Sequence, residues 1–252
     1  MIATHHLEAP GGIRLAFHEI GEGRPLILIH GYFSDADTNW IKFGHSALLA
    51  EAGFRVIMPD LRGHGQSDKP HDPASYPRDI LADDQFALIE HLGLTDFDLG
   101  GYSLGGRTVA RMLARGCAPK RAVISGMGLQ GLIDTGQRAG HFRNVLDNIG
   151  KHERGSPAFM AEAFLKTSGG DPVALLRGLD SFVDTPVEAI QGFDLPVAVI
   201  CGEDDQDNGS ASSLAEALPQ GTLISVRGNH MSAVVKPELG QAFCAFLNGA
   251  SE

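Results

Sequence analysis

Short apolar runs alternate with amphipathic segments along most of the chain. The apolar runs are short and mostly continuous, as expected for strands that are covered on both faces of a sheet. They lie at 26–29, 55–58, 97–99, 122–124, 197–200 and 223–226. Segments with helical spacing lie between them, at 80–91, 108–114, 212–218 and 239–247. This alternation predicts an α/β fold with a doubly wound, mostly parallel sheet.

The beginning of the chain follows a different pattern. Residues 5–20 read as two strands on either side of the turn Pro10-Gly11-Gly12. A short glycine-containing turn joins neighbouring antiparallel strands and cannot join parallel ones. We therefore expect an antiparallel hairpin at the edge of the sheet.

The strand pattern stops between residues 127 and 185. Phe142, Val145, Leu146 and Ile149 follow the spacing of one apolar helix face. Prolines at first helical positions, each after a residue that can cap a helix, mark further helix starts at Ser156-Pro157, Asp171-Pro172 and Thr185-Pro186, the last with Glu188 completing a capping box. We predict a core domain made of 1–126 and 186–252 and a helical cap inserted at 127–185.

Composition narrows the classes of partner. The chain has 252 residues, of which 43% are hydrophobic, and this suits one large globular domain. Twenty Lys and Arg against thirty-one Asp and Glu give a net charge of −11, which repels nucleic acid and acidic membranes. There is no apolar run of about 18 residues and no signal-peptide pattern at the start. We expect a soluble, cytoplasmic protein that binds neither nucleic acid nor membrane; its oligomeric state stays open.

Cysteine usage agrees with a reducing compartment. The three cysteines, Cys117, Cys201 and Cys244, are an odd number and have no C-x-x-C spacing. Neither a disulfide framework nor a zinc cluster fits this pattern. We predict buried, inert thiols.

The strongest chemical signal is the G-x-S-x-G sequence Gly101-Tyr102-Ser103-Leu104-Gly105, which follows one predicted strand and precedes a predicted helix. A strand that turns directly into a helix forces the serine into strained backbone geometry, and the glycines remove side chains that would clash. The turn also places Ser103 at a helix N-terminus, where amide donors stabilise an oxyanion. We predict that Ser103 is a catalytic nucleophile.

A serine hydroxyl needs a histidine base and an orienting carboxylate. His230 lies in the loop after the last predicted strand, where this fold places the base. Four carboxylates, at 203, 204, 205 and 207, follow the preceding strand. Asp205 is the predicted acid and Asp204 is the main alternative. Asp207 and Glu203 are the remaining, weaker candidates.

Together these motifs resemble the α/β-hydrolase superfamily over nearly the whole chain. The resemblance rests on His30-Gly31-Tyr32, on 60–67 with the sequence DLRGHGQS, on the elbow at Ser103, on Gly202-x-x-Asp205 and on Gly228-Asn229-His230. It implies an oxyanion hole made by the backbone amides of Tyr32 and Leu104, and it favours Asp205 as the acid. One departure is the absence of proline just beyond the acid, where Asp207-Asn208-Gly209 stands.

Several other candidates are better explained by structure than by catalysis. We interpret His64 as a structural residue of the 60–67 loop, and Arg107 as a helix arginine in preference to a ligand for a substrate carboxylate. His5-His6 lacks further ligands at metal-binding spacing. No metal or organic cofactor is predicted.

The predicted reaction is acyl transfer on small-molecule esters or lactones, as in a carboxylesterase. In this superfamily a serine at the elbow disfavours dehalogenase and epoxide hydrolase chemistry, which use aspartate there. A carbon–carbon bond hydrolase of ring-fission products, a cofactor-free perhydrolase and a hydrolase-derived receptor remain open. The apolar cap residues are expected mainly to pack: Phe142, Phe159, Met160, Phe164, Leu175, Leu176 and Phe182.

Overall fold

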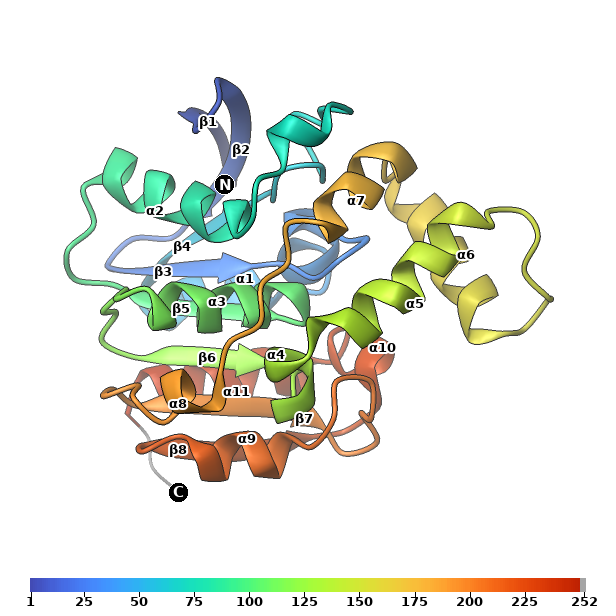
Figure 1. The fold of residues 1–252 in the computed structure, drawn as a ribbon. Coiled ribbons are helices and arrows are strands. Elements are labelled where there is room, and N and C mark those ends of the chain that lie inside the picture. Colours follow the sequence, from blue (N-terminus) through green and yellow to red (C-terminus); the bar gives the residue numbers. More distant parts are fainter. Residues whose placement is uncertain (250–252) are drawn as a thin grey trace.

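The computed structural model describes residues 1–249, and within them an eight-stranded, mostly parallel sheet forms the centre of the molecule (Figure 1). The strand order is β1-β2-β4-β3-β5-β6-β7-β8. The strands are β1 (Ala3–Ala9), β2 (Ile13–Ile20), β3 (Arg24–Ile29), β4 (Phe54–Pro59), β5 (Asp98–Tyr102), β6 (Ala122–Ser125), β7 (Val197–Gly202) and β8 (Gly221–Val226). Strands β3 to β8 are parallel. The predicted fold class is confirmed.

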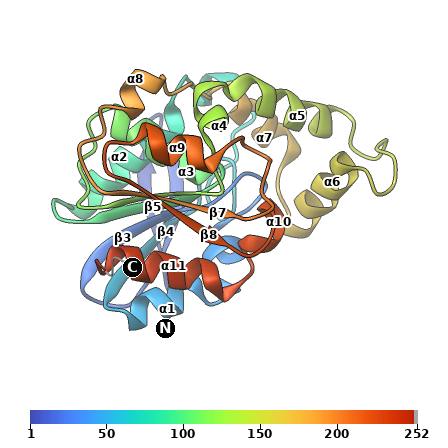
Figure 2. The same cartoon turned by 90° about the horizontal axis from the view of Figure 1, so that it is seen from below.

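Helices cover both faces of the sheet. Figure 2 shows α1 (His45–Glu51) and α11 (Pro237–Leu247) on one side, and α2 (Ile80–Leu92), α3 (Leu104–Ala114), α8 (Val187–Ile190) and α9 (Ala211–Ala217) on the other. Every residue of β5, β6 and β7 is buried between these layers. β8 is an edge strand, and Leu223 on it is exposed. Within residues 1–249 no helix is both long enough and apolar enough to cross a membrane.

The predicted N-terminal hairpin is confirmed. β1 pairs with β2 in antiparallel register, with Leu7 opposite Leu15, and β1 forms the edge of the sheet. The turn contains Gly11 and Gly12, both with positive φ, where a side chain would be strained. β2 in turn pairs antiparallel with β4 and so joins the hairpin to the parallel strands.

Two short helical elements near the site were not predicted from sequence. η1 (Asp37–Ile41) is a single π-helical turn, and α10 (His230–Ala233) follows β8. Both have fewer than six residues, which is too short for an apolar period to be recognised. α1 and the 3-10 turn η2 (Pro73–Ser75) were missed as well.

Between β6 and β7 the chain forms helices that extend beyond the carboxyl ends of the strands (Figure 1). They are α4 (Leu129–Ile133), α5 (Thr135–Asp147), α6 (Pro157–Ser168) and α7 (Pro172–Leu179). Pro157 and Pro172 are first helical residues as predicted. Ser156 and Asp171 cap the two helices, because their side chains accept hydrogen bonds from first-turn amides.

The third predicted helix start is wrong in detail. α8 begins at Val187, with Pro186 as its N-cap and no side-chain cap. The Thr185 hydroxyl is buried and has no hydrogen-bond partner among residues 1–249. A tertiary contact explains why Thr185 does not cap α8. The Thr185 amide donates to the carbonyl of Leu132 at 2.8 Å, and this bond holds Thr185 against α4.

The cysteine prediction is correct only in part. All three thiols are free, but Cys201 alone is fully buried, whereas Cys117 and Cys244 are partly exposed. Burial raises the thiol pKa of Cys117 to about 11 and that of Cys201 to about 12. These thiols therefore stay protonated and unreactive at neutral pH.

Candidate active site

Ser103 occupies a strained turn between β5 and α3. Its backbone has φ 55° and ψ −112°, a conformation that non-glycine residues rarely adopt. A Cβ on Gly101 would lie 2.3 Å from the carbonyl carbon of Gly105, and a Cβ on Gly105 would lie 2.0 Å from the carbonyl oxygen of Ile29. The two glycines therefore let the turn press against the sheet and hold Ser103 at the carboxyl end of β5.

The three predicted residues of the site come together in space. Nε2 of His230 lies 3.0 Å from Oγ of Ser103, and Nδ1 of His230 lies 2.8 Å from Oδ2 of Asp205. His230 is the first residue of α10, and Asp205 follows β7. The Asp205 carboxylate accepts a hydrogen bond from Nδ1–H of His230. In this tautomer Nε2 carries no proton and can accept the proton of the Ser103 hydroxyl.

The structure distinguishes among the four candidate carboxylates. Asp205 is 6% exposed, whereas Glu203 and Asp204 are exposed. Burial raises the pKa of Asp205, but its hydrogen bonds to His230 and to the amide of Asp207 outweigh burial and leave the pKa below its usual value. Asp207 is paired elsewhere, with Arg138. Asp205 is therefore an ionised group at neutral pH and is the carboxylate in contact with the histidine.

Neighbouring groups hold His230 in place. The hydroxyl of Tyr102, the residue before the serine, donates to the His230 carbonyl at 2.7 Å. The Asn229 side chain accepts from the amides of Met231 and Ser232 and forms a capping box at the start of α10. The asparagine of Gly228-Asn229-His230 was visible in the sequence as part of a motif, but its capping role was not predicted.

The predicted oxyanion-hole residues are Tyr32, which lines the same cavity as Ser103, and Leu104, which directly follows it. Leu104 is the first residue of α3, and a Cβ on Gly31 would lie only 3.4 Å from Cβ of Ser103. Among the described residues, neither amide donates to a protein acceptor. The Tyr32 side chain is fixed by the hydrogen bond from its hydroxyl to the carbonyl of Leu175 at 2.8 Å. Within the described chain the backbone amides of both residues are therefore free of protein acceptors, as an oxyanion hole requires.

A cavity of about 510 Å³ opens onto Ser103 and His230, and its volume lies within the usual range for small-molecule sites. Its apolar lining comes from the core and from α5 and α6: Tyr32, Phe33, Phe142, Pro157, Met160, Ala161, Ala163, Phe164, Met231 and Val234. Three of the seven apolar side chains expected mainly to pack, Phe142, Met160 and Phe164, line this cavity. Phe142 and Phe164 also pack against the core as expected, whereas Met160 is 60% exposed. The apolar faces of α5 and α6 are shared between docking the cap and enclosing the site.

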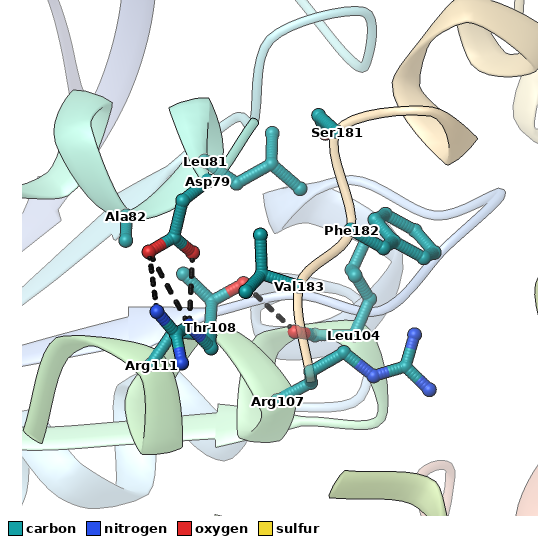
Figure 3. A pocket seen from close by; sticks show the side chains of 10 residues that line it. All are labelled: Asp79, Leu81, Ala82, Leu104, Arg107, Thr108, Arg111, Ser181, Phe182 and Val183. Carbon is teal, nitrogen blue, oxygen red and sulfur yellow. Dashed lines mark hydrogen bonds and ion pairs between the residues drawn. The ribbon is translucent and has the colours of Figure 1, made fainter. Parts of the chain in front are cut away.

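Arg107 lies outside this cavity. Its Nε donates to the carbonyl of Gly131 at 3.1 Å, its guanidinium stacks over Phe182, and burial lowers its pKa to about 10. Figure 3 shows it at a separate small pocket, with its guanidinium directed away from the Asp79–Arg111 ion pair. The contacts agree with the structural role predicted for it.

The other histidine candidates do not line the cavity that contains Ser103. His64 is buried, its Nδ1 lies 3.0 Å from the Arg62 carbonyl, and burial lowers its pKa to about 3, so it stays neutral. His5 and His6 are exposed on β1. No group of three His, Cys, Asp or Glu side chains within residues 1–249 is arranged to hold a metal ion.

Known proteins share parts of this sequence. A family model described as alpha/beta hydrolase fold matches residues 24–147. The AB hydrolase superfamily protein YisY of Bacillus subtilis (strain 168) is 38% identical over 112 residues, which cover 44% of this chain and 40% of that relative. The non-heme chloroperoxidase CPO-A1 of Kitasatospora aureofaciens is 26% identical over 275 residues, which cover 94% of this chain and 97% of that one. For YisY and one further curated relative, the chain spans only 40% and 36% of their length.

Solved structures share the whole architecture. A thermophilic esterase from Thermogutta terrifontis, solved with malate bound, superposes with a TM-score of 0.78. The superposition covers 99% of this chain and 100% of the esterase, at 24% sequence identity. At this identity the likeness concerns the fold.

Proposed function

The chain belongs to the α/β-hydrolase superfamily, and we propose that it is a serine hydrolase of carboxylesterase type that cleaves small-molecule esters or lactones. One observation carries the proposal. Ser103, His230 and Asp205 form a continuous series of contacts at 3.0 and 2.8 Å, and Ser103 opens into an apolar cavity. This arrangement has the geometry that activates a serine hydroxyl.

In the proposed mechanism, Nε2 of His230 takes the Ser103 proton while Oγ attacks the carbonyl carbon. The oxyanion that forms accepts hydrogen bonds from the amides of Tyr32 and Leu104. His230 then gives its proton to the leaving alkoxide, and an acyl-enzyme remains. Water, deprotonated by His230, releases the acid and restores Ser103. The ionised Asp205 stabilises the imidazolium in both halves of the reaction.

We propose that residues 127–185 act as a cap that selects the substrate. Their helices supply Phe142, Met160 and Phe164 to the cavity wall, and apolar walls favour uncharged acyl groups of moderate size. The net charge of −11 supports a small molecule as the partner, in preference to nucleic acid or an acidic membrane. A cytoplasmic location stays a prediction.

The proposal is tested with 4-nitrophenyl esters of increasing acyl length, using wild type, Ser103→Ala and the control Ser212→Ala. We expect many turnovers for wild type and the control, falling rates for acyl chains that exceed the cavity, and a loss of at least about 10⁴-fold for Ser103→Ala. If wild type turns over no ester, the proposal is wrong, and carbon–carbon cleavage or a receptor role becomes the better hypothesis.

A second candidate is a cofactor-free perhydrolase, and the near full-length similarity to a non-heme chloroperoxidase favours it. In this reaction hydrogen peroxide replaces water at the acyl-enzyme, so that a peracid leaves and Ser103 regains its proton. Acetate and hydrogen peroxide would then yield peracetic acid in a Ser103-dependent manner. The ratio of peracid formed to ester hydrolysed separates this activity from simple hydrolysis.

A further inference from the structure

Asn39 is a buried polar residue beside the nucleophile, and neither the sequence motifs nor the proposed mechanism uses it. It is 4% exposed and lines the cavity that contains Ser103. Its Oδ1 accepts a hydrogen bond from the Gly31 amide at 2.6 Å. Gly31 immediately precedes Tyr32, whose amide is one of the two proposed oxyanion donors. Asn39 therefore supports the backbone segment that presents this donor.

The π-helical turn η1 explains how Asn39 reaches this position. The Lys42 amide donates to the Asp37 carbonyl at 2.8 Å, a bond between residues five apart that widens the turn. Asn39 and Trp40, although adjacent, are both buried as a result. Trp40 packs on Phe243 beneath the sheet, with ring centroids 5.7 Å apart, while Asn39 lines the cavity. Turns of this type often occur at functional sites.

The chemistry of the contact fixes the orientation of the amide. A backbone N–H can only donate, so the Asn39 atom that faces Gly31 must be the oxygen. This leaves Nδ2 as the free donor of the side chain, and no acceptor for it occurs among residues 1–249. Nδ2 is not among the fully enclosed polar atoms that lack a partner, so it is accessible from the cavity and can donate a hydrogen bond to a bound molecule.

We propose that Asn39 is a positioning residue for the oxyanion hole and a hydrogen-bond donor to the bound substrate. Oδ1 holds Gly31 so that the Tyr32 amide stays aimed at the developing oxyanion, and Nδ2 donates to a second oxygen of the ester or lactone. This inference rests on the proposed function and names a residue that the proposed function does not require. Donors aligned before the reaction stabilise the transition state most, because they need not reorganise during it.

The test compares Asn39→Ala with the control Thr38→Ala, which removes a side chain of similar size from the same turn but outside the cavity lining. For Asn39→Ala we expect kcat/KM to fall about 10- to 100-fold, with kcat lowered by the loss of the Oδ1 contact to Gly31 and KM raised by the loss of the Nδ2 donor to the bound substrate. A trifluoromethyl ketone, which forms a tetrahedral oxyanion adduct with Ser103, should lose affinity by a similar factor. Thr38→Ala should match wild type in both measurements.

Asn39→Asp keeps the acceptor for Gly31 and replaces the Nδ2 donor with a negative charge. Its kcat/KM relative to wild type should rise as the pH falls and the introduced carboxyl is protonated. If Asn39→Ala does not fold, the pH dependence of kcat/KM for Asn39→Asp relative to wild type still tests whether Asn39 donates a hydrogen bond to the substrate. An Asn39→Ala enzyme equal to wild type, or a pH-independent ratio near one for Asn39→Asp, would overturn the inference while leaving the esterase proposal intact. A wild type without turnover would overturn the esterase proposal and the inference with it.

Discussion

Nη2 of Arg138, on the cap helix α5, lies 2.7 Å from Oδ2 of Asp207, and the Asp207 amide donates to Oδ1 of Asp205 at 3.0 Å. Helix α5 is thus joined through an ion pair to the loop that carries the proposed catalytic acid. Arg138 and Asp207 line the active-site cavity and also a neighbouring polar groove of about 450 Å³. The Arg138–Asp207 ion pair therefore lies at the boundary between the cavity and the polar groove.

Removing Arg138 should change substrate selection more than stability. The ion pair is partly exposed, 20% for Arg138 and 42% for Asp207, so its loss should cost less than about 1 kcal/mol. The guanidinium also stacks over Phe142, which lines the cavity. For Arg138→Ala we expect KM to change several-fold across an acyl series and the melting temperature to shift by only a few degrees.

Arg143→Ala is the matched control for Arg138→Ala. Arg143 lies on the same helix and pairs with Asp180 at 2.6 Å, but it does not line the cavity. Its KM values should stay at wild-type levels. Equal kinetic effects from the two variants would show that the Arg138–Asp207 pair has no special role.

Asp60 should make stability depend on acid pH. Burial raises its pKa, but hydrogen bonds from His18 and from the amides of Gln66 and Ala36, together with the nearby His30, lower it from 3.8 to about 2. The folded state therefore binds this proton more weakly than the unfolded state. The charged group contributes about 2 kcal/mol above pH 4, and this contribution is lost as the pH falls towards 2.

Urea unfolding of wild type and Asp60→Asn at pH 7, 4 and 3 checks this expectation. The difference in unfolding free energy should be largest at pH 7 and should narrow below pH 4. Asp37→Asn, at an exposed position, should differ from wild type by no more than about 0.5 kcal/mol at pH 7. A constant difference between wild type and Asp60→Asn at all three pH values would contradict the assignment.

Gly105→Ala should abolish activity and destabilise the fold, because its Cβ would lie 2.0 Å from the Ile29 carbonyl oxygen and 2.5 Å from the Ile29 carbonyl carbon. Neither backbone atom can move without shifting β3. Gly140→Ala, in the cap helix α5, meets no atom within 4 Å and should stabilise the protein by about 1 kcal/mol. Thermal unfolding and ester turnover of the two variants distinguish a steric requirement from a general effect of glycine substitution.

The buried Arg62–Asp84 pair should be essential to stability. Nε and Nη2 of Arg62 lie 3.0 and 2.7 Å from the Asp84 carboxylate oxygens, and both side chains are at most 1% exposed. Arg62→Met leaves Asp84 buried without a counter-charge and should cost about 3–5 kcal/mol. Lys120→Met, which breaks an exposed pair with Asp96, should cost less than about 1 kcal/mol. Chemical unfolding measures both, and similar losses would refute the distinction.

The sequence by itself predicted the sheet and the strained turn that holds Ser103. Continuous apolar runs predicted β3 to β7 because a buried parallel strand cannot tolerate polar faces. The spacing of Gly101, Ser103 and Gly105 predicted the elbow, because it is set by sterics within five consecutive residues. Position after a strand selected His230 and narrowed the acid to four carboxylates, since the carboxyl ends of parallel strands share one edge of the sheet, and the resemblance to the family favoured Asp205 among them.

Only the tertiary structure decided which groups meet across the chain. It showed that Asp207 pairs with Arg138 of the cap, that Thr185 is held against Leu132, and that Phe142 and Phe164 enclose the cavity. Asn39 had no signal in the sequence, because its partner Gly31 is brought to it by a single π-helical turn too short to leave a periodic pattern. Local sterics and apolar periodicity depend on residues that are close together in the sequence and can be recognised from it. Contacts between distant polar groups depend on how the helices and strands pack.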